Sequence, residues 1–257
     1  MGLTPGTADY APGTVRYSFL VVLQNARPVF TPRARIWLAR SLDGKPFYRT
    51  VARLQPTGVT VETDEHDVPS IYVTHLRIPK PGKYWVLAEP VGGTPVQGVG
   101  TIVVKDETAS PAVGARAIAS QTPTIRSARG DLTKLTTREP PDTELLRHSI
   151  ADSLEAKKPF VLVFATPKFC ESRTCGPVVS VVDEVRRRFA GRGVRFIHVE
   201  IYEGNNPAQG PNRWVKEWKL PSEPWVFLVG RDGRIKAKFE GSFSVGELRA
   251  AVERTLL

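Results

Sequence analysis

The period of the apolar residues changes near residue 142, and this change constrains the fold more than any other feature of the chain. Between residues 10 and 105, β-branched and aromatic side chains occupy every second position in short segments, which turns rich in Pro, Gly and Asp separate. Such alternation is typical of half-buried β-strands. After residue 142, strand-length apolar runs alternate with segments in which apolar residues recur every three or four positions, as in helices. The 257 residues are therefore expected to form two domains of different class.

The first part of the chain reads as all-β. The alternating segments predict strands at 15–22, 34–39, 71–78, 83–88 and 99–104. Several short strands separated by turns favour a β-sandwich. The run Pro81-Gly82-Lys83-Tyr84 leads into a strand and resembles a segment of many immunoglobulin-like domains. We therefore predict an immunoglobulin-like sandwich over residues 1–105, a resemblance of fold that implies no function.

The composition changes again between the two parts. Residues 106–141 are small and polar and are interrupted by prolines, which predicts an extended linker lying partly against the domains. From Asp142, a plausible helix N-cap, the pattern predicts a helix to Lys157. The order that follows is a buried strand, a helix, a second strand, a short helix, a hairpin and a terminal helix, over the ranges 160–165, 178–189, 194–199, 211–220, 225–239 and 244–257.

The two cysteines of the chain, Cys170 and Cys175, lie within one hexapeptide. The pair is open to three interpretations: a small structural disulfide, two inert buried thiols, or a redox or metal pair. Two ligands do not complete a tetrahedral zinc site, and no cluster of His or Asp flanks them at ligand spacing. We therefore expect no metal and no cofactor.

Two further motifs resemble those of the thioredoxin-like superfamily. Cys175-Gly176-Pro177-Val178 is similar to the Cys-Gly-Pro-Cys of thioredoxins, between a buried strand and a helix. Residues 220–228, which include Pro224, resemble the segment of that family in which a cis-proline precedes a core strand. The resemblance covers residues 142–257 and implies an α/β thioredoxin-like domain. The predicted fold class is therefore an immunoglobulin-like β-sandwich followed by an α/β thioredoxin-like domain.

The sequence also departs from the family pattern. Val178 stands where thioredoxins have their second cysteine, and the extra cysteine lies five residues before Cys175. In another alignment, Phe169-Cys170 matches the Trp-Cys of the family and residues 171–174 are an insertion. The strand at 160–165 contains no carboxylate, so the buried acid of many thioredoxins has no counterpart there.

The resemblance implies thiol–disulfide chemistry at the start of a helix. Gly176 and Pro177 would open that helix, whose amino end stabilises a thiolate. Cys175 would attack a partner disulfide and Cys170 would resolve the mixed disulfide, although the sequence does not decide which cysteine attacks.

The segment around the proline implies a groove for the substrate. Pro224, if cis, and Glu223 would border a groove where a substrate strand pairs. The carboxylate of Glu223 would oppose thiolate formation. Trp225 either covers the site or faces the core.

These features lead to two hypotheses of function. The first is a thiol–disulfide oxidoreductase-like protein that acts on protein thiols or disulfides. The alternative is a non-catalytic interaction protein with an envelope protein as partner, in which the cysteines form a structural disulfide. Both suit an extracytoplasmic location, in a bacterial envelope or after secretion. Residues 1–5 fit a chain cut after a signal or anchor, and equally a cytoplasmic protein.

The charge of the chain indicates no specific nucleic-acid partner. The formal net charge is +10, but the excess of basic residues is +5 over residues 1–105, +1 over 106–141 and +4 over 142–257. A nucleic-acid site concentrates its basic residues on one face or element. No apolar run reaches the roughly 20 residues that a membrane-spanning helix needs.

Overall fold

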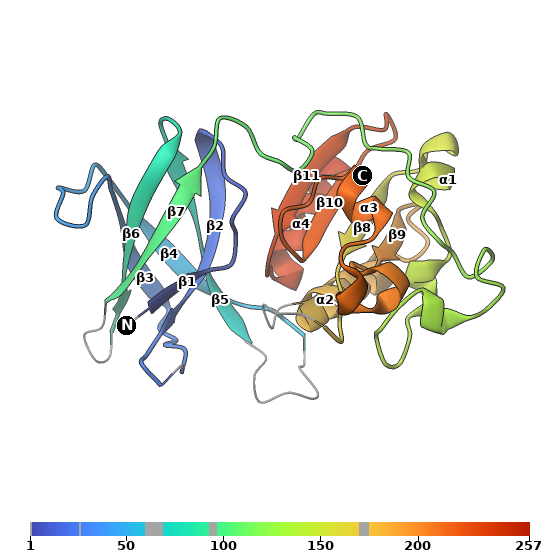
Figure 1. Cartoon of the computed structure of the whole chain (residues 1–257), viewed down its shortest axis with the longest axis horizontal. Helices are drawn as coiled ribbons and strands as arrows, with labels where there is room; N and C mark the ends of the chain where they lie inside the picture. The colour runs from blue at the N-terminus through green and yellow to red at the C-terminus, as the bar shows by residue number, and fades with distance from the viewer. Residues whose placement is uncertain (1, 26, 60–68, 93–96, 170–174) are drawn as a thin grey trace. The chain divides into compact units, whose positions relative to one another are not determined.

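A computed structural model of the chain describes residues 2–25, 27–59, 69–92, 97–169 and 175–257. It divides into two compact units (Figure 1). The first comprises residues 1–56 and 69–108, and the second comprises residues 57–68 and 109–257. The segment between the predicted domains, from residue 109 onward, thus groups with the second unit.

The first unit is a seven-stranded closed barrel with the strand order β1-β2-β5-β4-β3-β6-β7. All neighbouring strands pair antiparallel except β1 and β7, which pair parallel where Gly2 lies opposite Val99. Alternate side chains point inward and form one buried core. The strands are β1 (Gly2–Pro5), β2 (Gly13–Val22), β3 (Arg33–Ala39), β4 (Tyr48–Pro56), β5 (Ser70–Ile78), β6 (Gly82–Val91) and β7 (Gly98–Val104).

Two glycines of β7 allow the short strand β1 to close the barrel. A Cβ at Gly100 would lie 3.0 Å from Leu3 Cδ2 and 3.1 Å from the Leu3 carbonyl oxygen, and one at Gly98 would lie 3.3 Å from the Gly2 carbonyl oxygen. Real Cβ atoms rarely approach so closely, so the seam between β1 and β7 depends on glycine at these positions.

The predicted immunoglobulin-like sandwich is therefore wrong. The sequence pattern indicated five strands in this region, whereas the structure adds β1 and β4 and closes the sheet on itself. No strand was predicted at residues 2–5, yet they pair with β2, and Gly2 also pairs with β7. The physical reason is that periodicity shows which segments are strands but not which edges meet, and a barrel and a sandwich share the same alternation.

The second unit is built on a four-stranded sheet of order β11-β10-β8-β9. The strands β8 and β9 are parallel, and the helix α2 connects them, whereas β10 and β11 form an antiparallel hairpin beside β8. The strands are β8 (Phe160–Phe164), β9 (Arg195–Val199), β10 (Trp225–Val229) and β11 (Ile235–Glu240). The α-helices are α1 (Ile150–Glu155), α2 (Cys175–Arg188), α3 (Arg213–Glu217) and α4 (Val245–Thr255). Short 3-10 turns lie at η1 (Leu132–Lys134), η2 (Thr143–Leu146), η3 (Glu203–Asn205) and η4 (Pro207–Gln209).

This sheet separates two apolar cores. Val161 and Val163 of β8 pack with the apolar residues of α2 and α4 on one face. Phe160, Leu162 and Phe164 point to the other face, where the core includes residues of α1 and α3. All five residues of β8 are buried, as its continuously apolar sequence predicts.

The predicted fold class is wrong for this unit too, because it is not a clear α/β thioredoxin-like domain. Only one face of the sheet is covered by long helices, the 14-residue α2 and the 11-residue α4. The other face is covered by the short α1 and α3 and by irregular segments. The helix predicted from Asp142 to Lys157 is in fact the 3-10 turn η2, capped by Asp142, followed by α1, capped by Ser149.

The second face of the sheet is therefore covered by irregular segments and not by a layer of long helices. The sequence motifs did not predict this, because the contacts join distant residues. Within the described residues, no helix combines the length and apolar character needed to cross a membrane.

Candidate functional site

The cysteine segment joins the end of β8 to the start of α2. Cys170 lies outside the described residues, and so does the side chain of Cys175. The backbone of Cys175 is described, and it is the first residue of α2. Pro177 follows in the first turn, where the backbone N–H that proline lacks has no partner within the helix.

The amino end of α2 suits a negative charge. No Asp or Glu occurs in its first turn, whereas Arg186, Arg187 and Arg188 occupy its last turn. This distribution complements the helix dipole at the carboxyl end and leaves the positive amino end without a carboxylate of its own. The apolar stripe that the sequence predicted is buried and holds the helix on the sheet, and it includes Val178, Val179, Val182 and Val185.

Pro224 lies at the same end of the sheet as this segment. Trp225, the first residue of β10, lies opposite Phe164, the last residue of β8, in an antiparallel pair. Pro224 therefore comes just before β10 where Ala165 comes just after β8. The Glu223–Pro224 peptide bond is cis, Pro224 is buried, and Glu223 is partly buried.

Trp225 belongs to the core. Its side chain is buried and stacks on Phe227, with ring centroids 5.7 Å apart. Its indole N–H donates to Ser222 Oγ at 3.1 Å, and that hydroxyl donates to Glu240 Oε1 at 2.6 Å. Trp225 was expected either to cover the site or to face the core, and these contacts are those of a residue packed in the core.

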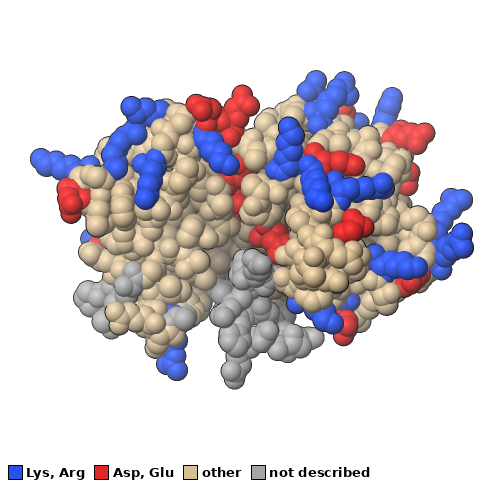
Figure 2. All heavy atoms as spheres, in the orientation of Figure 1, with Lys and Arg blue, Asp and Glu red and all other residues tan. Residues whose placement is uncertain are grey.

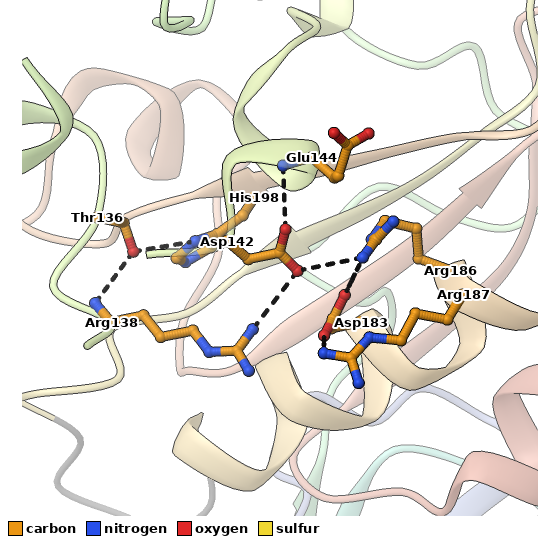
Figure 3. A network of polar contacts seen from close by, with 8 residues as sticks. All are labelled: Thr136, Arg138, Asp142, Glu144, Asp183, Arg186, Arg187 and His198. Atoms are coloured by element: carbon orange, nitrogen blue, oxygen red, sulfur yellow. Dashed lines mark hydrogen bonds and ion pairs between the residues drawn. The ribbon is translucent and has the colours of Figure 1, made fainter. Parts of the chain in front are cut away.

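A buried histidine follows on the neighbouring strand. His198 lies opposite Val163 in the parallel pair of β8 and β9. Its Nε2 is 3.0 Å from the Ala165 carbonyl oxygen, and its Nδ1 is 3.5 Å from Thr136 Oγ1 (Figure 3). A carbonyl only accepts, so Nε2 carries the proton and Nδ1 accepts from the hydroxyl. Burial lowers the pKa of His198, which favours this neutral form.

Glu200, which follows β9, is linked by hydrogen bonds to the residues just before the cysteine segment. Its Oε1 accepts hydrogen bonds from the Thr137 backbone N–H at 2.5 Å and from Thr137 Oγ1 at 2.9 Å. Thr137 Oγ1 in turn accepts from the Lys168 backbone N–H at 3.2 Å. Glu200 Oε2 is buried and has no hydrogen-bond partner among the described residues. Thr137 thus links the buried carboxylate of Glu200 by hydrogen bonds to Lys168, which precedes the two cysteines.

Arg186 of α2 links two carboxyl groups, that of Asp142, which caps η2, and that of Asp183 on α2 (Figure 3). Burial, and then the neighbouring Asp183 carboxyl, raise the pKa of Asp142 to about 6. Burial opposes ionisation of Asp183 as well, but hydrogen bonds from Asp142 and Arg186 outweigh it and lower the pKa of Asp183. Of the two carboxyl groups, Asp142 is therefore the one that binds a proton at the higher pH.

Arginines surround this pair of carboxyl groups. Arg186 contacts Asp183 at 2.7 Å and Asp142 at 3.7 Å, Arg187 contacts Asp183 at 2.6 Å, and Arg138 contacts Asp142 at 3.7 Å. Asp183 is 2% exposed, so its carboxyl group is not open to a ligand.

The sequence analysis missed these polar groups. It assigned no role to Thr137, Asp183, His198 and Glu200. The available signal was a pair of polar residues two apart at the end of an apolar strand, His198 within β9 and Glu200 directly after it. No group of three or more residues able to hold a metal ion occurs in the part of the chain that the structure describes.

Comparison with known proteins adds little to this geometry. No protein-family model and no curated protein matches the chain. A solved structure assigned as a thiol:disulfide interchange protein DsbE from Chlorobium tepidum is similar at 15% identity and a TM-score of 0.33, over 39% of this chain and 83% of that one. A likeness at this level carries no argument about function.

Proposed function

We propose that the second unit performs thiol–disulfide exchange through Cys175 and Cys170. The observation that carries the proposal is the position of Cys175 as the first residue of a 14-residue helix that follows a fully buried strand. A thiolate is stabilised at the amino end of a helix, and the thiolate is the nucleophile in disulfide exchange.

The surroundings described above support the same chemistry. The first turn of α2 has no carboxylate that would oppose a thiolate, and Pro224 lies at the same end of the sheet. In the proposal, the backbone beside Pro224 and Glu223 offers the edge on which a substrate strand pairs. Trp225 supports that edge from the core rather than contacting the substrate.

The exchange requires two steps. The Cys175 thiolate attacks one sulfur of a partner disulfide, which forms a mixed disulfide and releases the other partner sulfur as a thiolate. The Cys170 thiolate then attacks Cys175, which forms the Cys170–Cys175 disulfide and releases the second partner thiol. The partner gains two electrons and the pair loses two. A partner dithiol reverses both steps, so the direction depends on the two reduction potentials.

Trapping of the mixed disulfide tests which cysteine attacks. With oxidised insulin as substrate, C170S is expected to accumulate a covalent adduct through Cys175, because no resolving thiol is present. C175S is the matched control and is expected to accumulate none. An adduct with C175S alone would mean that Cys170 attacks and Cys175 resolves. If the variant that lacks both cysteines, C170S/C175S, still reduced insulin, the proposal would be rejected.

The reduction potential separates exchange from a structural disulfide. Proteins that exchange disulfides have potentials between about −120 and −270 mV, whereas structural disulfides lie below about −300 mV. We expect alkylation followed by mass spectrometry in glutathione buffers to give a value in the first range. A bond that stays closed throughout these buffers would instead support a non-catalytic protein.

A further inference from the structure

The outer surface of the barrel over four neighbouring strands, β4, β3, β6 and β7, has an unusual composition. We call it the β4-β3-β6-β7 face. The register places Trp37 of β3 between Arg49 of β4 and Leu87 of β6, and places Arg35 opposite Val51. The intervening residues of these strands point into the barrel core, so these side chains share one outward face.

Basic residues dominate this face. Its cations are Arg33, Arg35, Arg49, Arg53 and Lys83, all exposed. Glu89 is the acidic side chain on these strands and is 3.5 Å from Arg35. Among the described residues, the other four cations have no carboxylate partner. The barrel unit as a whole has 12 Lys and Arg against five Asp and Glu. Figure 2 shows Lys and Arg side chains projecting from the surface of both units.

Apolar and aromatic side chains lie among these cations. Trp37, Trp85 and Leu87 are partly exposed, and Val51 and Val103 are 50% and 57% exposed. Trp and Arg are the residues most enriched at the energetic centres of protein interfaces, where Lys and acidic residues are depleted. Isolated exposed apolar residues need no explanation, but these lie on adjacent strands and form one patch.

We propose that the β4-β3-β6-β7 face docks an acidic polypeptide that presents apolar side chains between its carboxylates. The exposed arginines would complement carboxylates of the partner, and the valines and Leu87 would contact its apolar side chains. This interaction is independent of the thiol chemistry of the second unit.

The contact between Lys83 and Trp85 favours a polypeptide over a nucleic acid. Stacked bases need open aromatic faces. The ring of Trp85 is already covered by the ammonium of Lys83, whose Nζ lies 5.3 Å from the ring centroid. A phosphate backbone also has no apolar group to cover Val51 and Val103.

A titration of tryptophan fluorescence tests the proposal on the full chain. The probe is a synthetic peptide in which Glu and Leu alternate, compared with the Lys–Leu peptide and with oligothymidylate. The test variant replaces Arg33, Arg49 and Arg53 with Gln. The matched control replaces Arg27, Lys45 and Lys80, exposed cations outside this face, with Gln, so that both variants have the same net charge.

We expect saturable binding of the Glu–Leu peptide that the test variant weakens by about tenfold or more, equivalent to about 1.4 kcal/mol, while the control stays within about twofold. Trp37→Leu is expected to remove much of the fluorescence change. An equal loss in both variants, no binding of the peptide, or tighter binding of oligothymidylate would each overturn the proposal. A self-associated wild type that the test variant makes monomeric would assign the face to a second copy instead, which also overturns it.

Discussion

The barrel and the four-stranded sheet use their charged residues in opposite ways. In the second unit, Arg138, Arg186 and Arg187 surround two carboxyl groups, and Asp183 is almost fully buried. On the β4-β3-β6-β7 face, exposed arginines stand among apolar side chains, and one of them pairs with Glu89. Charged residues therefore stabilise internal structure in the second unit, whereas on this face of the barrel they remain exposed to solvent.

The largest effect is expected from the buried network. Asp183→Ala leaves Arg186 and Arg187 without their closest carboxylate, and loss of one partner from a buried ion pair costs about 3–5 kcal/mol. Urea denaturation should show a loss of about 3 kcal/mol, because Arg187 is largely exposed. Glu184→Ala, next to it on α2 and in an exposed pair with Arg188, is the control and should cost less than about 1 kcal/mol. Equal losses would remove the contrast between the two units.

A smaller effect is expected at Glu200. Glu200→Ala removes the acceptor of the Thr137 backbone N–H and hydroxyl, and an unsatisfied buried donor costs about 1–3 kcal/mol. Glu200→Gln retains a side-chain oxygen as acceptor and should recover most of that loss in the same urea experiment. If both variants were equally unstable, the negative charge and not the hydrogen bonds would explain the role of Glu200.

The pH dependence of stability tests the Asp142–Asp183 pair. Because the pKa of Asp142 is raised to about 6, its stabilising contribution is present below its ordinary pKa of 3.8 and is lost as the pH rises through 6. Asp142→Asn keeps an oxygen that caps Glu144 and does not ionise. The variant should therefore gain stability relative to the wild type between pH 5 and pH 7.5, by on the order of 1 kcal/mol.

That gain is measured as the difference between urea midpoints at the two pH values. No difference would contradict the raised pKa of Asp142, because a carboxyl group that is ionised in both the folded and the unfolded state over this range gives no pH dependence.

The smallest effect is expected on the barrel. In a double-mutant cycle of Arg35→Gln and Glu89→Gln, the coupling free energy should stay below about 1 kcal/mol, since both side chains are partly exposed. A larger value would mean that Arg35 and Glu89 stabilise each other strongly, so that Arg35 is less available to a partner.

Much of the element order was predictable from the sequence. The apolar run of β8, the valine stripe of α2, and the Ser244–Glu247 capping box of α4 are local signals, and the structure has each element there. Strand β4 was missed, because its outward positions alternate between Arg and Val and obscure the period of its inward residues. The cysteine pair stays a prediction, since Cys170 lies outside the described residues.

The sequence by itself determined the local elements and the change of class near residue 142, because periodicity and caps act over a few neighbouring residues. Tertiary structure alone decided that β1 closes a barrel through Gly98 and Gly100, and that His198 and Glu200 lie buried beside residues 136–138. It also gathered the arginines of β3 and β4 on one face. These outcomes depend on which strand edges meet and which segments pack together, and such contacts join residues that are far apart in the chain.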